Sequence, residues 1–567
     1  MKQFEKRIDD KGNPYLATPL SGYLLTRLPL LNKSTGFSRE ERRELGLEGL
    51  VPPHSSTIEQ QVQRTYANYS GFTTALDKHV YLRVLQDRNE VLFYALLEQH
   101  LEEMLPIIYT PTVAEAVQKF SLIYRFPRGL VVSTENIDRI DEVLATAPLP
   151  DVRLVVATDS EGILGIGDQG FGGMAICIGK LSLYTAAAGI DPATTLPIEL
   201  DVGTNRADLL DDPLYLGVRH ERLVGPAYED FIERFVVAFK KRFPDALLQW
   251  EDFSKQKAVD VMNRYRDVLP SFNDDIQGTG AVVLAGLLAA ARKTRRSMTD
   301  ETYVVHGAGA GGMGVGRQIV VGLQRQGLSR AEAVARVLMI DSAGLVVADR
   351  PGLESYKREL AQDPSRTAGW QVAGAVPSLL ETVTNAKATG IIGLSGQAGA
   401  FDEAVVKAVL ANSPAPIVFP LSNPTVNSEA VPEDVYAWTG GRAIVATGSP
   451  FPNVQHEGRS FVVGQGNNAF VFPGVGLGAL VTRATKVTDN MLTAAAEALS
   501  EYTDPMRLME GAVYPSVSAL GRASRHVAVA VANQAMADGV ARREVKDTQE
   551  AVSAGIWEPR YLPIRRA

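Results

Sequence analysis

The sequence has almost no cysteine, no long hydrophobic run and no excess of positive charge. Its one cysteine, Cys177, excludes an intrachain disulfide and favours a reducing compartment, so we expect a cytoplasmic protein. The first residues lack the apolar core of a secretory signal. The apolar run 281–291 is too short to span a membrane. Because the net charge is −8, with acids and bases interspersed, we expect no nucleic-acid partner. Because no segment is apolar enough to enter a bilayer, we expect no membrane partner.

The chain of 567 residues is long enough for several domains, and its 45% hydrophobic content is that of a globular protein. In residues 84–105, apolar positions recur every three or four residues, which predicts helix. Short apolar runs at 153–159, 197–203 and 245–253 predict strands. From about residue 301, apolar runs alternate with helical stretches, which predicts an α/β fold with a parallel sheet covered on both faces.

A glycine-rich turn follows the first of these later strands. Gly307, Gly309 and Gly312 form G-x-G-x-x-G between a predicted strand and a predicted helix. Such glycines allow a tight turn, close approach of a pyrophosphate and close helix packing, so the turn favours a dinucleotide site over a simple packing turn. Asp341 ends the next strand and is a candidate ligand for the adenosine ribose hydroxyls.

Two pairs of adjacent acids border apolar segments. Glu251 and Asp252 end a predicted strand, and Asp274 and Asp275 precede the apolar run 281–291. A cluster of carboxylates without histidine or cysteine suits a hard cation such as Mg²⁺ or Mn²⁺. For either pair taken alone, helix capping and solvated acids remain the favoured interpretation.

Several other polar residues lie in apolar or turn segments. Lys180 lies in an apolar stretch, where a lysine either extends to water, the favoured alternative, or is buried and able to accept a proton. Tyr109 is a core tyrosine or a phenolic acid, with core favoured for the residue alone. Asn423, Asn467 and Asn468 are turn formers or hydrogen-bond donors to a substrate carboxylate and a nicotinamide amide.

Taken together, these segments resemble the malic enzyme family. The resemblance extends from about residue 30 to the end of the sequence. It rests on short motifs in family order: YTPTV (109–113), PRG (127–129), ILGIGDQG (163–170), GKLSLYTAAAGI (179–190), LDVGTN (200–205), WEDF (250–253), FNDDIQGT (272–279), LSNPT (421–425), ATGSPF (446–451) and GQGNN (464–468).

The resemblance implies a four-part architecture. It comprises a helical N-terminal domain (1–127), a discontinuous central substrate and metal domain (128–273 and 467–539), a Rossmann-like NAD(P)-binding domain (274–466) and a C-terminal tail in oligomer contacts (540–567). The resemblance also implies a homodimer or homotetramer.

The resemblance further implies oxidative decarboxylation of (S)-malate to pyruvate and CO₂, with reduction of NAD or NADP and a requirement for Mg²⁺ or Mn²⁺. Glu251, Asp252 and Asp275 would hold the metal. The implied catalytic residues are Tyr109 as general acid, Lys180 as general base, Asp274 and Asp275. Asn423 and Asn467 would contact substrate and nicotinamide, and Asn468 would contact substrate.

The sequence departs from the family pattern in two places. Animal members carry an arginine for the substrate carboxylate where this chain has Gly162, so Arg125, Arg128 or the asparagines are expected to contribute instead. Asp341 favours NAD, whereas Ser342 and Lys357 stand where NADP-preferring members often carry such residues. The balance of these signals favours NAD.

Two rival functions remain open. Malolactic enzyme, a relative that converts malate to lactate with retained NAD, is similar in residues 158–168, 215–222 and 274–286, whereas YTPTV, GDQG and ATGSPF resemble oxidative malic enzymes. The other rival is a catalytically silent dinucleotide-binding protein. The presence of all the residues expected for catalysis and metal binding argues against it.

Overall fold

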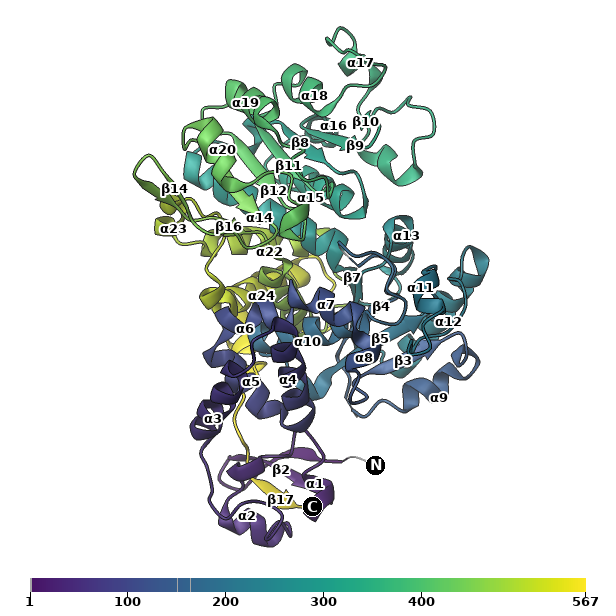
Figure 1. The fold of residues 1–567 in the computed structure, drawn as a ribbon, viewed down its shortest axis with the longest axis vertical. Helices are drawn as coiled ribbons and strands as arrows, with labels where there is room; N and C mark the ends of the chain where they lie inside the picture. The colour runs from purple at the N-terminus through teal and green to yellow at the C-terminus, as the bar shows by residue number, and fades with distance from the viewer. Residues whose placement is uncertain (1–2, 150, 164) are drawn as a thin grey trace. The chain divides into compact units, whose positions relative to one another are not determined.

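The computed structural model describes residues 3–149, 151–163 and 165–567 (Figure 1). The chain divides into two compact units, which are described separately. Unit 1 comprises Met1–Val156, Gln169–Phe243 and Ile556–Ala567, and unit 2 comprises Ala157–Asp168 and Pro244–Gly555. The four-domain division expected from the sequence draws its boundaries elsewhere and stays a prediction. Leu164, in the motif ILGIGDQG, lies outside the described residues.

Unit 1 contains the helical region expected near the N-terminus. The apolar pattern at 84–105 forms parts of three helices, α4 (Ala75–Arg88), α5 (Glu90–Gln99) and α6 (Leu101–Ile108). The break between α4 and α5 is at Asn89, whose side chain accepts a hydrogen bond from Leu92 N and caps α5. Tyr109 follows α6, and a cis peptide bond then joins Thr110 to Pro111. α7 (Thr112–Gln118) follows this turn.

A small sheet in unit 1 brings together segments from opposite ends of the sequence. β2 (Pro14–Thr18) pairs antiparallel with β1 (Glu5–Ile8) and parallel with β17 (Ile564–Arg566). Figure 1 shows β2 and β17 side by side. Ile564 is 2% exposed and belongs to an apolar core with Leu25, Phe37 and Leu45. The predicted C-terminal extension therefore wraps onto the N-terminal segment of its own chain.

Unit 1 also contains a helix formed by the apolar stretch around Lys180. This helix, α10 (Met174–Ala188), is buried on nearly all sides and packs on β5 (Thr195–Asp201). β5 pairs parallel with β3 (Leu130–Ser133). α10 ends at Gly189, where a φ of 69° places the chain in the left-handed conformation that favours glycine. α12 (Pro226–Arg242) lies further along the chain.

Unit 2 contains the predicted parallel sheet, with strand order β10-β9-β8-β11-β12-β13-β16. Its parallel strands are β8 (Tyr303–His306), β9 (Val337–Asp341), β11 (Gly390–Gly393), β12 (Ile417–Pro420), β13 (Ile444–Thr447) and β16 (Gly464–Gln465). The edge strand β10 (Gly344–Leu345) pairs antiparallel with β9. Since β9 and β11 lie on opposite sides of β8, the strand order reverses there, which is where such sheets bind ligands. The predicted fold class is confirmed.

The two acid pairs of the sequence lie at the ends of two neighbouring strands of unit 2. β6 (Leu247–Glu251) pairs parallel with β7 (Ser271–Asn273), and α13 (Lys255–Tyr265) connects them. After β7 the chain forms a π-helical turn, Asp274–Gly278, and then α14 (Thr279–Thr294). α14 contains the buried apolar run 281–291, and it packs against α15 (Ala310–Arg325) and α22 (Asp489–Tyr502).

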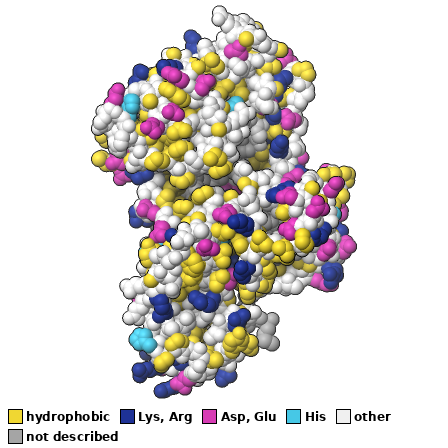
Figure 2. All heavy atoms as spheres, viewed as in Figure 1, with side chains coloured by type: hydrophobic (Ala, Val, Ile, Leu, Met, Phe, Trp, Pro, Cys, Tyr) yellow, Lys and Arg dark blue, Asp and Glu magenta, His cyan; other side chains and the backbone are white. Residues whose placement is uncertain are grey.

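The molecular surface has no region dominated by one charge on the face shown in Figure 2, where acidic and basic side chains are interspersed. Among the described residues, no helix is both long enough and apolar enough to cross a bilayer.

Candidate active site

Three carboxylates converge in unit 2. Glu251, Asp252 and Asp275 each offer an oxygen, and these oxygens all lie within 4.8 Å of one another. Adjacent residues of a regular strand would point to opposite faces. Here Glu251 is the last residue of β6, and Asp252 leaves the strand with a φ of 57°. This left-handed backbone, which aspartate tolerates better than most residues, lets both side chains face Asp275.

Hydrogen bonds hold the carboxylate cluster in place. The backbone N–H of Asp252 donates to Oδ2 of Asp275 over 2.7 Å, and Nε2 of Gln249 donates to Oε2 of Glu251 over 2.6 Å. Glu251 is 2% and Asp252 4% exposed, so solvated acids are the wrong interpretation of this pair. Three grouped carboxylates, two of them buried, provide the oxygen ligands that Mg²⁺ and Mn²⁺ prefer, so the residues present fit such an ion.

Asp274 lies beside the cluster, in the π-helical turn, and is fully buried. Nδ2 of Asn468 donates to its carboxylate and to its backbone oxygen, over 3.2 Å in each case. A Cβ atom at Gly278 would lie 1.9 Å from Oδ1 of Asp274, so a side chain at position 278 would displace this carboxylate. Asn468, expected to contact substrate, therefore anchors the turn that carries both aspartates.

Lys180 and Tyr109 lie together in unit 1. Lys180 Nζ is 5.3 Å from the centroid of the Tyr109 ring. Lys180 is 1% exposed, so the prediction that its side chain extends to water is wrong. Tyr109 is also buried, at the turn between α6 and α7. A buried amine beside a phenol provides two groups that can transfer protons.

The glycine-rich turn in unit 2 has the geometry its spacing predicts. Gly307 has a φ of 114°, and a Cβ there would lie 2.4 Å from the carbonyl carbon of Leu394. At Gly312 a Cβ would lie 1.7 Å from the carbonyl oxygen of Gly307. Gly309 precedes α15 as its N-cap and faces open space. The first and third glycines are thus required by packing, and the second leaves room for a phosphate at the start of the helix.

Asp341 and Lys357 line a cavity beside the glycine-rich turn, together with Ser342. The carboxylate of Asp341 accepts hydrogen bonds from Arg350 over 2.9 Å and from Lys357 over 2.8 Å. Burial opposes ionisation of Asp341, but the hydrogen bonds from Arg350 and Lys357 outweigh it and lower the pKa of this carboxyl. Asp341 is therefore ionised and is held by two cationic side chains. The sequence position of Asp341 did not predict these two contacts.

The asparagines near the ends of the last strands occupy structural positions. Asn423 precedes a cis peptide bond to Pro424, and its Oδ1 accepts a hydrogen bond from Oγ of Ser449 over 2.6 Å. The side chain of Asn467 accepts from Ala469 N and caps a short helical turn. Their proposed contacts with substrate and nicotinamide stay predictions.

Sequence reasoning missed a buried acid, Glu429. It is fully buried and accepts hydrogen bonds from the backbone N–H and hydroxyl groups of Ser395, both over 2.8 Å, and of Ser422. It thereby joins the loops that follow β11 and β12. Its neighbours in the sequence, Ser428 and Ala430, give no signal of this role. His306, which ends β8 and lines the same cavity as Asp341, was missed as well.

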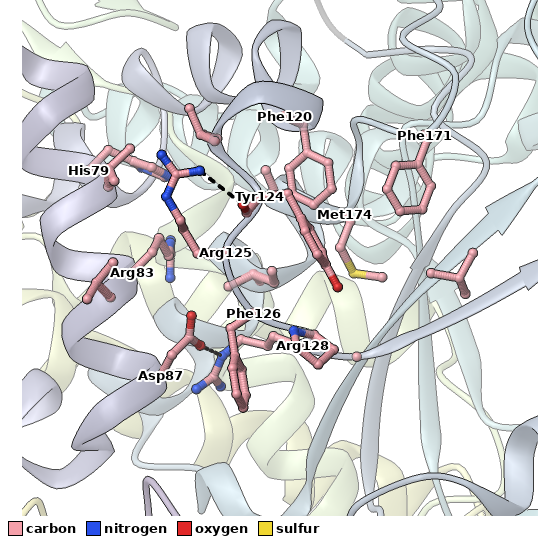
Figure 3. Close-up of a pocket in the computed structure, with 18 residues that line it drawn as sticks. His79, Arg83, Asp87, Phe120, Tyr124, Arg125, Phe126, Arg128, Phe171 and Met174 are labelled. Carbon is pink, nitrogen blue, oxygen red and sulfur yellow. Dashed lines mark hydrogen bonds and ion pairs between the residues drawn. The ribbon is translucent and has the colours of Figure 1, made fainter. Parts of the chain in front are cut away.

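The arginines considered for the substrate carboxylate are engaged within unit 1. Arg128 forms ion pairs with Asp87 over 2.8 Å and with Glu90 over 2.9 Å. Arg125 donates to the backbone oxygens of Leu122 and Tyr124, and Figure 3 shows both arginines at one pocket. Their contribution to substrate binding stays a prediction.

Gly162 has a structural reason to lack a side chain. A Cβ at this position would lie 2.5 Å from the carbonyl oxygen of Phe253. Its backbone N–H donates to the carbonyl oxygen of Asp252 over 2.7 Å. Gly162 thus packs directly on the loop that carries the carboxylate cluster, where the backbone leaves no space for an arginine.

The sheet and its glycine-rich turn define a doubly wound α/β protein of the dinucleotide-binding type. Two family models match the chain: "Malic enzyme, N-terminal domain" over residues 86–266 and "Malic enzyme, NAD binding domain" over residues 276–536. An NAD-dependent malic enzyme of Pseudomonas aeruginosa is 47% identical over 553 residues, covering 97% of this chain and 98% of the relative. The chain belongs to the malic enzyme family, which confirms the resemblance seen in its motifs.

Solved structures agree at the level of the fold. A malic enzyme from Entamoeba histolytica superposes with a TM-score of 0.57 at 24% identity, covering 90% of each chain. A malic enzyme from Pyrococcus horikoshii gives a TM-score of 0.55 at 26% identity, covering 80% of this chain and 88% of the other.

Proposed function

We propose that this chain oxidatively decarboxylates (S)-malate to pyruvate and CO₂ with NAD as the hydride acceptor and Mg²⁺ or Mn²⁺ as the required ion. The name of the Pseudomonas relative supports the reaction and the choice of NAD. The observation that carries the proposal is the convergence of Glu251, Asp252 and Asp275 within 4.8 Å. A dinucleotide-binding protein without catalytic activity would have no use for this cluster.

The proposed roles follow from chemistry and position. When bound, the cation would polarise the substrate oxygens and NAD would accept the hydride from C2. Lys180 takes the proton of the C2 hydroxyl, and Tyr109 donates a proton to C3 after CO₂ has left. Glu251, Asp252 and Asp275 hold the ion, and Asp274 supports their turn.

The remaining contacts concern the coenzyme and the substrate. Gly307, Gly309 and Gly312 bind the pyrophosphate, while Asp341, Ser342 and Lys357 line the adenosine end. Asn423 and Asn467 contact substrate and nicotinamide.

A direct test follows the product and the coenzyme together. Malate, Mn²⁺ and NAD should give a rise in absorbance at 340 nm with equimolar pyruvate. Lactate without accumulated NADH would instead establish the malolactic reaction, which the sequence of residues 158–168 and 274–286 favours as the second candidate. NADP in a parallel assay should give a lower kcat/KM than NAD.

The role of Lys180 has its own test. The Lys180→Ala variant should bind NADH as the wild type does, measured by NADH fluorescence, but its turnover should fall by at least 100-fold because a positioned base contributes about 10²–10⁴-fold. Turnover near that of the wild type would remove Lys180 as the base.

Three further proposals concern organisation. The four domains expected from the sequence fold as 1–127, 128–273 with 467–539, 274–466 and 540–567, and limited proteolysis should cut first near their boundaries. The protein forms a homodimer or homotetramer, which light scattering on a size-exclusion column would measure. It acts in the cytoplasm, in keeping with its single cysteine.

A further inference from the structure

One arginine of unit 1 contacts the segments that carry both proposed proton-transfer residues. Arg83, on α4, donates through Nη2 to the carbonyl oxygen of Ile108 over 2.9 Å. Through Nη1 it donates to Oγ of Ser182 over 2.9 Å and to Oε1 of Gln86 over 2.7 Å. Three helices, α4, α6 and α10, therefore meet at a single guanidinium group.

The two acceptors stand next to the proposed proton-transfer residues. Ile108 ends α6 and directly precedes Tyr109, and Ser182 follows Lys180 by two positions on α10. The helices are in close contact here, because a Cβ atom at Gly179 would lie 3.0 Å from the carbonyl oxygen of Ile108. A displacement of α6 against α10 would change the 5.3 Å spacing between Lys180 Nζ and the Tyr109 ring.

A second residue of α4 holds the preceding carbonyl. His79 lies one helical turn before Arg83, and its Nδ1 is 2.8 Å from the carbonyl oxygen of Ile107. Figure 3 shows His79 and Arg83 on the same helix. Burial, reinforced by the charge of Arg83, lowers the pKa of His79 to about 3, so the ring is neutral at pH 7 and donates from Nδ1. Both carbonyls before Tyr109 are thus fixed by α4.

The hydrogen bonds at Ser182 are mutually consistent. Its hydroxyl donates to the carbonyl oxygen of Ile178 over 2.8 Å and so accepts from Arg83. Arg83 can make both contacts at once because the guanidinium presents its donors in a rigid planar fork, whereas a lysine ammonium is a single point donor. Arg83 also lies over the ring of Phe93, with Cζ 5.9 Å from its centroid.

We propose that Arg83 is a positioning residue that holds the Tyr109 turn against the Lys180 helix at the spacing needed for proton transfer. Its effect on the reaction is indirect, through the backbone of Ile108 and the hydroxyl of Ser182. The inference rests on the proposed function, because it assumes that Lys180 and Tyr109 transfer the protons.

The test compares Arg83→Met, Arg83→Lys and Arg83→Ala with Arg234→Met, which removes an arginine from the surface helix α12. Displacement of catalytic groups by about 1 Å can cost 100-fold in rate. We therefore expect Arg83→Met to lower kcat by 10- to 100-fold while the KM for NAD stays within twofold. The kcat of Arg83→Lys should lie between those of Arg83→Met and the wild type, and Arg234→Met should keep full activity.

Two measurements separate positioning from general destabilisation. Guanidinium chloride at a few tens of millimolar, below the denaturing range, should restore part of the kcat of Arg83→Ala but none of that of Lys180→Ala. Ser182→Ala removes one acceptor without opening a large cavity and should lower kcat several-fold with an unchanged melting temperature. An Arg83→Met enzyme within twofold of the wild-type kcat, or an Arg83→Ala enzyme that guanidinium leaves unchanged, overturns the inference.

The failure of the inference can be distinguished from failure of the proposed function. If Lys180→Ala and Tyr109→Phe turn over normally, the assignment of the proton-transfer residues is wrong. If both are impaired while the Arg83 variants have wild-type kcat, only the role of Arg83 is wrong.

Discussion

The Asp275→Asn substitution should stabilise the protein in the absence of a divalent ion and should remove most of the stabilisation that the ion gives. In the absence of an ion, Glu251, Asp252 and Asp275 repel one another, so the loss of one charge should stabilise the fold. In the presence of the ion the wild type should gain stability that the variant lacks. Asparagine keeps an oxygen that can accept the 2.7 Å hydrogen bond from Asp252 N, so the backbone should be retained.

The size of the effect follows from the geometry. Two unit charges 4.8 Å apart repel by about 3.5 kcal/mol at an effective dielectric constant of about 20. Neutral asparagine removes two of the three pairs, which amounts to roughly 7 kcal/mol at this spacing before screening by solvent and salt. For the ion, a concentration 100 times the dissociation constant stabilises the protein that binds it by about 2.7 kcal/mol.

Thermal unfolding in EDTA and in excess MnCl₂ measures both effects. The variant should melt above the wild type in EDTA and should show a much smaller shift with Mn²⁺. The control is Asp260→Asn, which makes the same charge change at an exposed position of α13 where the carboxylate accepts from Gln256. This control should respond to Mn²⁺ as the wild type does. Equal Mn²⁺ shifts in wild type and Asp275→Asn would refute the reasoning.

Three further predictions concern other parts of the chain. Gly312→Ala should lower both the melting temperature and the affinity for NADH, because its Cβ would lie 1.7 Å from a backbone oxygen. Gly309→Ala should lower only the affinity, because a Cβ at this position faces open space. Fluorescence titration with NADH measures the affinity of both variants. The pKa of His79, about 3 in the fold against 6.5 ordinarily, means that the unfolded chain takes up more protons between these values. Stability is therefore lost as pH falls below about 6.5, by about 2 kcal/mol at pH 5, and urea unfolding of His79→Gln should lack that loss. Tyr561→Phe removes the acceptor of a 2.7 Å hydrogen bond from Asn89 and should destabilise the fold by about 1 kcal/mol, and unchanged urea unfolding would contradict this.

The sheet of unit 2 could be predicted from the sequence because its strands are short apolar runs that end at polar residues. The run 337–341 is β9 without a shift at either end, and the G-x-G-x-x-G motif starts directly after β8 and extends into the first turn of α15. These features depend on local patterns of burial and backbone freedom. Local patterns are what a sequence displays.

The carboxylate cluster could be predicted only through the family resemblance. From the residues alone, each acid pair favoured capping or a solvated surface, because the convergence depends on a left-handed backbone at Asp252 and on the pairing of β6 with β7. Neither feature has a local signal. Lys180 was ambiguous for a related reason: a helix that is apolar on all sides does not show which way its single lysine points.

The division of the chain into these two units could not be predicted from the sequence either. Residues 157–168 belong to unit 2 although the segments on both sides belong to unit 1. The ion pairs of Asp341 with Arg350 and Lys357 likewise form only when the chain is folded, so the sequence gives no local signal of them.

The pairing of β17 with β2 has a consequence for biosynthesis. Strand β2 leaves the ribosome before its neighbour at residues 564–566, which is made roughly 550 residues later. At about 5–20 residues per second, the β1–β2 hairpin waits about half a minute or longer for this neighbour. Throughout that interval one edge of β2 is open to other strands, so chaperones that shield nascent chains would have a defined target in this segment.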